Sequence, residues 1–260
     1  MFSTPSSGRK QHLHYNVEMP KHCMWELPYL LFAQTAAGRP KLAKTFYICC
    51  MAEIDRHVSA LLLDCKAVIL EPENPFTWAS GWKSPIYCDN RITLSYPEVR
   101  DYIKEAFRTS IEKHFEAPDL IAGVATGAIA QGALVADLLK LPFAYVRPSV
   151  KEHGRQNLIE GRVQSGQKVV VVEDLISTGG SSLKAVEALR EAGAEVLGMV
   201  AIFSYGFEVA AENFRKAGVV LHTLTNYHVL IETALDSGAV KQEQVELLQQ
   251  WREDPSRWKS

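Results

Sequence analysis

The stretch VVVVEDLISTGGSS, residues 169–182, places two carboxylates between a run of valines and a run of hydroxyl and glycine residues. The valines predict a buried interior strand, and Glu173 and Asp174 then stand at its carboxyl end, where open α/β sheets bind ligands. Glycines, hydroxyls and a helix N-terminus beyond the acids favour an anion such as a phosphate. The acids themselves suit a ribose, because they accept hydrogen bonds from its hydroxyls and favour positive charge on its ring.

Other readings of this stretch are weaker. The sequence has no GxxxxGK[ST] loop and no GxGxxG after the first strand, so the two familiar nucleotide fingerprints are excluded. In a purely structural reading, the acids cap a turn and the serines cap a helix. An isolated acid pair fits that reading equally well, but the whole string favours a binding site.

Two further segments are dense in polar and turn-forming residues. PFTWASGWKSPIYCDNR, residues 75–91, reads by composition as a structured loop with short strands. VRPSVKEHGRQNLIEG, residues 146–161, carries Arg147, Lys151 and His153, and by composition alone it is a solvated surface loop.

Together the three segments resemble one enzyme family. The first string resembles the phosphoribosyl-diphosphate signature of type I phosphoribosyltransferases. The segment 75–91 resembles the hood that closes over the pyrimidine in orotate phosphoribosyltransferases, and 146–161 resembles that family's mobile catalytic loop. Along the chain the three motifs follow the order of that family, at 75–91, 146–161 and 169–182. This order, within residues 51 to about 210, identifies the chain as a member of the orotate phosphoribosyltransferases. Residues 1–50 have no part in the resemblance.

The resemblance implies a fold, a reaction and a set of residues. The fold is α/β, the type I phosphoribosyltransferase fold, with a central mostly parallel sheet flanked by helices and a small hood from about 70–95 with C-terminal contributions. The reaction moves a phosphoribosyl group from phosphoribosyl diphosphate to orotate, giving orotidine 5'-monophosphate and diphosphate for pyrimidine synthesis. The implied catalytic residues are Lys151, His153 and Asp174. The implied substrate-binding residues are Lys83, Arg147, Lys151, His153, Glu173, Asp174, Leu175, Ile176, Ser177, Thr178, Gly179, Gly180 and Ser181.

The chain departs from the family pattern in its cations. Some members have lysines at the positions of Ala79 and Pro148 and at or near Gly127, and an arginine around residues 204–207, and all are missing here. Lys83 is a candidate substitute for the lost hood cation. The family resemblance also implies Mg²⁺ as cofactor, and we expect no dedicated protein ligands because Mg²⁺ is commonly held through substrate phosphates and water.

Partners and alternatives follow from the same comparison. The resemblance implies a homodimer with shared active sites and a cytoplasmic enzyme, with no nucleic-acid and no membrane partner. A purine or uracil phosphoribosyltransferase is disfavoured by the hood segment. The alternative from another class is a regulator that senses phosphoribosyl diphosphate. Such regulators tend to carry a basic face or an added helix-turn-helix.

Alternating apolar strands and amphipathic helices would position these residues, in a parallel sheet covered on both faces. We expect strands at 119–125, 142–146, 168–173, 195–203 and 219–224. We expect helices at 51–68, 95–115 (with Ser95 as N-cap), 128–140, 180–193 (closed by Gly193), 207–218, 226–238 and 241–254.

Composition sets the outer limits. The 260 residues are 47% hydrophobic, carry a net charge of -2 and include five cysteines without a CxxC pair, which fits a reducing compartment. No window reaches the ~18 apolar residues of a membrane helix. Residues 1–50 carry +4, with six Lys and Arg against two Glu, and lack a regular apolar period. We expect them to be a disordered extension or upstream sequence read as coding, and residues 51–260 to form the phosphoribosyltransferase domain.

Overall fold

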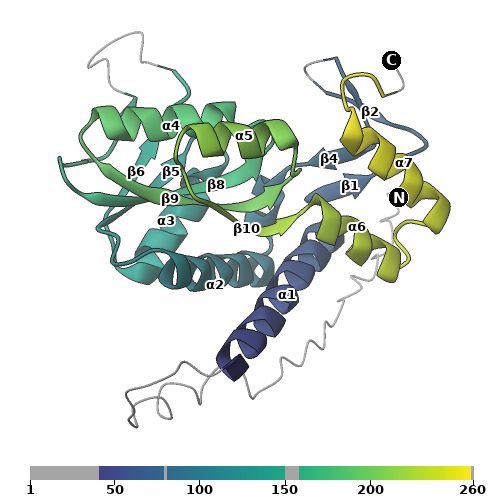
Figure 1. The fold of residues 1–260 in the computed structure, drawn as a ribbon, viewed down its shortest axis with the longest axis horizontal. Helices are drawn as coiled ribbons and strands as arrows, with labels where there is room; N and C mark the ends of the chain where they lie inside the picture. Colours follow the sequence, from purple (N-terminus) through teal and green to yellow (C-terminus); the bar gives the residue numbers. More distant parts are fainter. Residues whose placement is uncertain (1–40, 79–80, 150–157, 259–260) are drawn as a thin grey trace, which may run out of the picture. The chain divides into compact units, whose positions relative to one another are not determined.

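A mixed six-stranded sheet forms the centre of the molecule (Figure 1). The computed structural model describes residues 41–78, 81–149 and 158–258, with side chains from Glu53 onward. The chain divides into two units at residues 44 and 45, and apart from the start of the first helix everything below concerns residues 45–260. The strand order of the sheet is β10-β9-β8-β5-β6-β7, in which only the pairing of β6 with the edge strand β7 is antiparallel. These strands are β5 (Leu120–Val124), β6 (Phe143–Val146), β7 (Ile159–Glu160), β8 (Lys168–Ile176), β9 (Glu195–Ser204) and β10 (Leu221–Asn226).

Helices cover both faces of the sheet, as expected (Figure 1). Alternate residues of each strand point to opposite faces, so the valines of β8 divide between two cores. Val170 and Val172 belong to the core shared with α2 (Pro97–His114) and α3 (Ala128–Leu139). Val169 and Val171 belong to the core shared with α4 (Gly180–Glu191) and α5 (Glu208–Lys216). This double burial explains why β8 begins as a continuous apolar run.

Two expected helix starts were wrong. The first helix, α1 (Lys41–Asp64), begins ten residues before Met51. Its first ten residues contain no Gly or Pro and include good helix formers, so nothing local stops the helix at 51. Helix α2 takes Tyr96 as its N-cap, without a side-chain bond, because Ser95 is already the last residue of the 3-10 helix η1 (Asn90–Ser95). The end of α4 agrees with expectation, since Gly193 follows it at φ +88°.

The segment before η1 forms two small antiparallel pairs. β1 (Val68–Leu70) pairs with β4 (Ile86–Cys88), and β2 (Phe76–Thr77) pairs with β3 (Lys83–Ser84). We call residues 68–88 the hood segment. It lies beside the C-terminal helix α7 (Gln242–Glu253), which follows α6 (Tyr227–Asp236) (Figure 1). Trp251 of α7 is fully buried, contacts Trp78 with ring centroids 5.6 Å apart, and donates from Nε1 to the Lys83 carbonyl at 3.2 Å.

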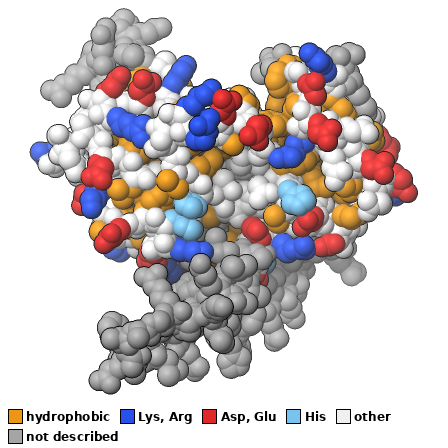
Figure 2. Space-filling view, viewed as in Figure 1, with side chains coloured by type: hydrophobic (Ala, Val, Ile, Leu, Met, Phe, Trp, Pro, Cys, Tyr) orange, Lys and Arg blue, Asp and Glu red, His pale blue; other side chains and the backbone are white. Residues whose placement is uncertain are grey.

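The surface carries charges of both signs. On the face drawn in Figure 2, basic and acidic side chains of the described residues are interspersed. Among the helices that the structure describes, none is long and apolar enough to cross a membrane.

Candidate active site

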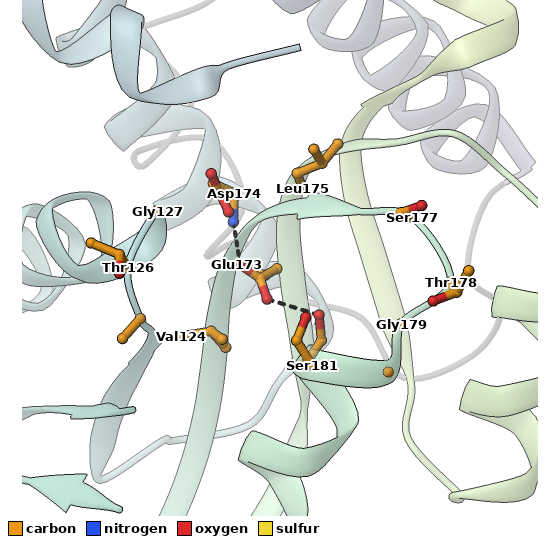
Figure 3. Close-up of a pocket in the computed structure, with 13 residues that line it drawn as sticks. Val124, Thr126, Gly127, Glu173, Asp174, Leu175, Ser177, Thr178, Gly179 and Ser181 are labelled. Carbon is orange, nitrogen blue, oxygen red and sulfur yellow. Dashed lines mark hydrogen bonds between the residues drawn. The ribbon is translucent and has the colours of Figure 1, made fainter. Parts of the chain in front are cut away.

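A pocket of about 300 Å³ opens at the carboxyl ends of β5 and β8. Neighbouring parallel strands end at the same edge of a sheet, so the loops that follow them face each other. Figure 3 shows the loop after β5 on one side, the turn from β8 into α4 on the other, and the two acids between them. Residues 124–127 line the first side, and Glu173, Asp174, Leu175 and residues 177–182 line the rest.

Glu173 points toward the start of α4 and is almost fully buried, with 4% of its surface exposed (Figure 3). One carboxylate oxygen accepts from the Ser182 hydroxyl at 2.8 Å, and the other accepts from the Asp174 backbone N–H at 2.9 Å. Burial raises the pKa of Glu173 well above its ordinary value, and the adjacent Asp174 carboxylate raises it further. Glu173 therefore lines the pocket with both carboxylate oxygens already in hydrogen bonds to the protein.

Asp174 points the other way, toward the start of α3 (Figure 3). Its carboxylate lies so close to Gly127 that a β-carbon there would collide with it. A carboxylate at a helix N-terminus is stabilised by the unpaired N–H groups and the helix dipole. The same contact explains why this loop carries no lysine at position 127, because Asp174 fills the space that a side chain would need.

The turn into α4 supplies the anion cradle. Gly179 adopts φ +80°, and a β-carbon there would come within 2.7 Å of the Phe214 ring, so only glycine fits without strain. Asn213 donates from Nδ2 to the Thr178 carbonyl at 3.0 Å and fixes the turn. The hydroxyls of Thr178 and Ser181 belong to exposed residues, so they are available to a ligand.

Most of the predicted cradle comes together here, with one exception. Glu173, Asp174, Leu175, Ser177, Thr178, Gly179, Gly180 and Ser181 all line the pocket. Ile176 does not, because its side chain is fully buried in the core under α4. Its backbone carbonyl accepts from the Tyr205 N–H at 3.0 Å and so holds the end of β8 in place.

Arg147 lies next to this pocket without lining it. It directly follows β6, whose last residue accepts from the Ala125 N–H at 2.8 Å, so it adjoins the loop after β5. Its Nη1 atom is 3.7 Å from the Glu160 carboxylate and makes no hydrogen bond within the described residues. Nη1 is therefore a buried donor that pairs with Glu160 through charge alone.

Of the other predicted cations, Lys83 does not line the pocket. Lys83 lies on the exposed side of the hood segment, where its ammonium donates to the Thr77 hydroxyl at 2.8 Å. Lys151 and His153 fall in 150–157, outside the described residues.

Among the residues of the site, Ser182, Gly127 and Asn90 were given no role at the acids by the sequence analysis, although Asn90 lies within the segment 75–91. Ser182 stands at the end of the quoted string, and its place one residue beyond Ser181 gave no sign that it faces Glu173. Gly127 was noted only for the lysine it lacks. Asn90 is 1% exposed and donates from Nδ2 to the Asp174 backbone carbonyl at 2.6 Å. A contact between residues 84 positions apart has no local sequence signal.

Comparison with known proteins decides the family. The model of the phosphoribosyl transferase domain matches residues 91–237. The chain is 58% identical over 204 residues to the orotate phosphoribosyltransferase of Cytophaga hutchinsonii, covering 78% of this chain and 98% of that one. The chain belongs to the orotate phosphoribosyltransferase family.

Two family members with lower sequence identity support the same assignment. The enzyme of Listeria monocytogenes is 54% identical over 205 residues, covering 79% of this chain and 98% of its own. The crystal structure of orotate phosphoribosyltransferase from Aeropyrum pernix superposes with a TM-score of 0.62 at 29% identity, covering 71% of this chain and 99% of that one. The type I phosphoribosyltransferase fold expected from the motifs is therefore confirmed.

The donor chemistry of this orotate phosphoribosyltransferase pocket fits Mg²⁺. Within the described residues, no group of three or more His, Cys, Asp and Glu side chains is placed to hold a metal ion. The pocket instead offers hard oxygen donors, the Asp174 carboxylate and the hydroxyls of Ser177 and Thr178. One carboxylate combined with substrate phosphates and waters is an ordinary Mg²⁺ environment.

Proposed function

We propose that the chain transfers the 5-phosphoribosyl group from phosphoribosyl diphosphate to orotate, giving orotidine 5'-monophosphate and diphosphate. This makes it a pentosyltransferase of pyrimidine nucleotide synthesis. One observation carries the proposal. In a chain 58% identical to an orotate phosphoribosyltransferase, a carboxylate and a hydroxyl-rich anion cradle share one pocket at the end of β8.

The mechanism follows from the charges at that pocket. As the bond from ribose C1' to diphosphate breaks, positive charge builds on the ring, as in glycoside hydrolysis. We assign the Asp174 carboxylate to that charge and the cradle of residues 177–181 to the 5'-phosphate, through N–H groups and hydroxyls; in support, these residues line one pocket. Orotate N1 then attacks C1' from the side facing the hood segment. Its proton is already off in the reactive form, so no strong base is required.

The leaving diphosphate needs cations. We assign Arg147, which follows β6 beside the loop after β5, to the diphosphate. We also assign Lys151 to the diphosphate. We assign His153 to the diphosphate as a contact or as a proton donor. Mg²⁺, held mainly by the substrate with Asp174 as the protein's carboxylate donor, would neutralise phosphate charge when bound.

The assembly and the working domain are also part of the proposal. We propose a cytoplasmic homodimer whose catalytic loops serve shared active sites, with no nucleic-acid or membrane partner. We propose residues 51–260 as the phosphoribosyltransferase domain, with 1–50 as an extension outside the catalytic machinery. In support, 204 residues of this chain account for 98% of the Cytophaga enzyme.

The test is the ultraviolet absorbance of orotate with purified protein, phosphoribosyl diphosphate and Mg²⁺, beside a chelator control. A metal-dependent fall that uracil and purine bases do not reproduce is the expected result. Binding of phosphoribosyl diphosphate without any turnover would favour the alternative, a sensor that keeps the fold. The charges of both signs on the face in Figure 2 give that alternative no added support.

A further inference from the structure

The backbone of Asp174 is held by a side chain from another part of the chain. Asn90 of η1 donates from Nδ2 to the Asp174 carbonyl oxygen at 2.6 Å. Its own amide oxygen lies 3.5 Å from the Cys88 thiol, which can donate to it. Asn90 is 1% exposed, and the bond to the half-buried Asp174 is part-buried. Partial burial reduces the competition from water for this bond.

The sheet leaves this carbonyl without a strand partner. β8 pairs with β5 only as far as Val172, opposite Gly123, because the chain after β5 turns into the pocket loop. On the other side, β8 continues to pair with β9 as far as Ile176. Buried backbone carbonyls require a partner, and at Asp174 the Asn90 amide takes the place of the missing strand.

Asn90 is itself anchored to the helix that faces Asp174. The Thr93 hydroxyl donates to the Asn90 carbonyl at 2.6 Å, and Gln131 of α3 donates from Nε2 to the Thr93 hydroxyl at 3.1 Å. Thr93 and Gln131 are also almost fully buried. Gln131 lies one helical turn after Gly127, where the Asp174 carboxylate rests. The contacts therefore form a closed ring through α3, η1 and β8.

We propose that Asn90 is a positioning residue for the transfer reaction, which fixes the backbone at Asp174 so that its carboxylate meets the ribose. The inference rests on the proposed function. Displacing a stabilising group by about 1 Å can cost about 10²-fold in rate.

The first experiment compares Asn90→Ala and Asn90→Asp with the matched control Ser59→Ala. Asn90→Asp keeps the shape but places a carboxylate against the Asp174 carbonyl. Ser59→Ala also removes a fully buried hydrogen bond, the 2.6 Å bond to Thr225, but on the far strand β10. We expect kcat to fall about 10- to 100-fold in both Asn90 variants, with KM for phosphoribosyl diphosphate changed by less than about threefold. Ser59→Ala should change thermal stability alone.

A double-mutant cycle separates positioning from a general loss of structure. If Asn90 acts through Asp174, adding Asn90→Ala to Asp174→Ala should lower kcat no further. Full additivity of the two effects, or an effect on KM alone, would overturn the proposal. So would an unchanged kcat in the single variants.

Hydrogen exchange at the amides of residues 173–176 tests the same idea without turnover. We expect faster exchange in Asn90→Ala than in Ser59→Ala. If the unaltered protein does not convert orotate, the proposed function fails while this measurement still decides the positioning claim. Equal exchange in both variants would refute it.

Discussion

The carboxylate of Asp174 occupies the space that a β-carbon on residue 127 would need. Gly127 has φ -61° and ψ -39°, an ordinary right-handed helical conformation that any residue adopts. The backbone does not require glycine there, but the contact with Asp174 does. The loop after β5 and the acid at the end of β8 are therefore fitted to each other.

This fit predicts a loss of activity without a loss of stability. In Gly127→Ala, the new methyl group should push the Asp174 carboxylate away from the start of α3. We expect kcat/KM for phosphoribosyl diphosphate to fall about 100-fold, since the displaced group is the one that we assign to the ribose. The free energy of unfolding should change by less than about 1 kcal/mol, because the entropic gain from alanine in the unfolded chain offsets the displacement of one side-chain end. Steady-state kinetics measure the change in kcat/KM, and urea denaturation measures the change in the free energy of unfolding. An unchanged kcat/KM in Gly127→Ala would show that this contact does not matter for activity.

Glu173 gives a prediction about pH. Because burial raises its pKa in the folded state above the ordinary 4.5, the folded protein binds more protons than the unfolded chain above that pH. The free energy of unfolding should therefore decrease as pH rises from 4.5 toward the raised pKa. Glu173→Gln cannot ionise, and its amide can still bond both Ser182 and the Asp174 N–H. The free energy of unfolding of Glu173→Gln, relative to that of the unaltered protein, should therefore increase as pH rises through this range.

Denaturation with urea at a series of pH values measures this difference between the two proteins. Glu187→Gln, on the exposed face of α4, is the matched control, and its pH profile should parallel that of the unaltered protein. Parallel profiles for Glu173→Gln and the unaltered protein would mean that Glu173 titrates as it does in the unfolded chain.

Lys83 is our candidate substitute for a missing hood cation, and its exposed position on β3 allows this role to be tested by substitution. Its ammonium is held by the Thr77 hydroxyl rather than by a carboxylate, so its charge is not neutralised by that contact. We expect Lys83→Ala to weaken orotate or diphosphate affinity about 5- to 10-fold through the loss of one charge-assisted bond. Lys216→Ala is the control, since that exposed lysine pairs with Glu212 on α5. If orotate and diphosphate bind equally well to the Lys83→Ala and Lys216→Ala variants, Lys83 is not part of the site.

Metal binding should depend on the substrate. If Mg²⁺ is held mainly by phosphoribosyl diphosphate, the protein alone should bind it weakly, and binding should strengthen when that substrate is present. Mn²⁺ titrations followed by electron paramagnetic resonance measure both conditions. Tight Mn²⁺ binding to the protein alone would instead require a ligand set beyond Asp174.

The sequence predicted what is local in the site. The apolar run of β8, the acids after it and the glycine turn into α4 are contiguous, so the sequence already groups most of the residues that line the pocket. The side chain of Ile176 was the exception, because alternation along β8 sends it into the core under α4. The start of α1 was missed because its first ten residues lack a regular apolar pattern.

Long-range contacts escaped the sequence reading. Whether Glu173 faces solvent or the Ser182 hydroxyl depends on how α4 packs against β8, and the sequence does not record that packing. The bond between Asn90 and Asp174 depends on where β5 stops pairing. Both are consequences of tertiary structure acting on residues that look ordinary in the chain.

The contact between Trp78 and Trp251 has a consequence for the order of events during synthesis. The cradle on β8 and α4 is complete once β9 and β10 have paired beside it, but the hood segment rests on Trp251 and its helix. A nascent chain on the ribosome therefore contains the proposed phosphate cradle before it contains the helix that supports the hood segment. We expect the hood segment, which we propose faces the acceptor, to gain its support only when α7 emerges from the ribosomal exit tunnel.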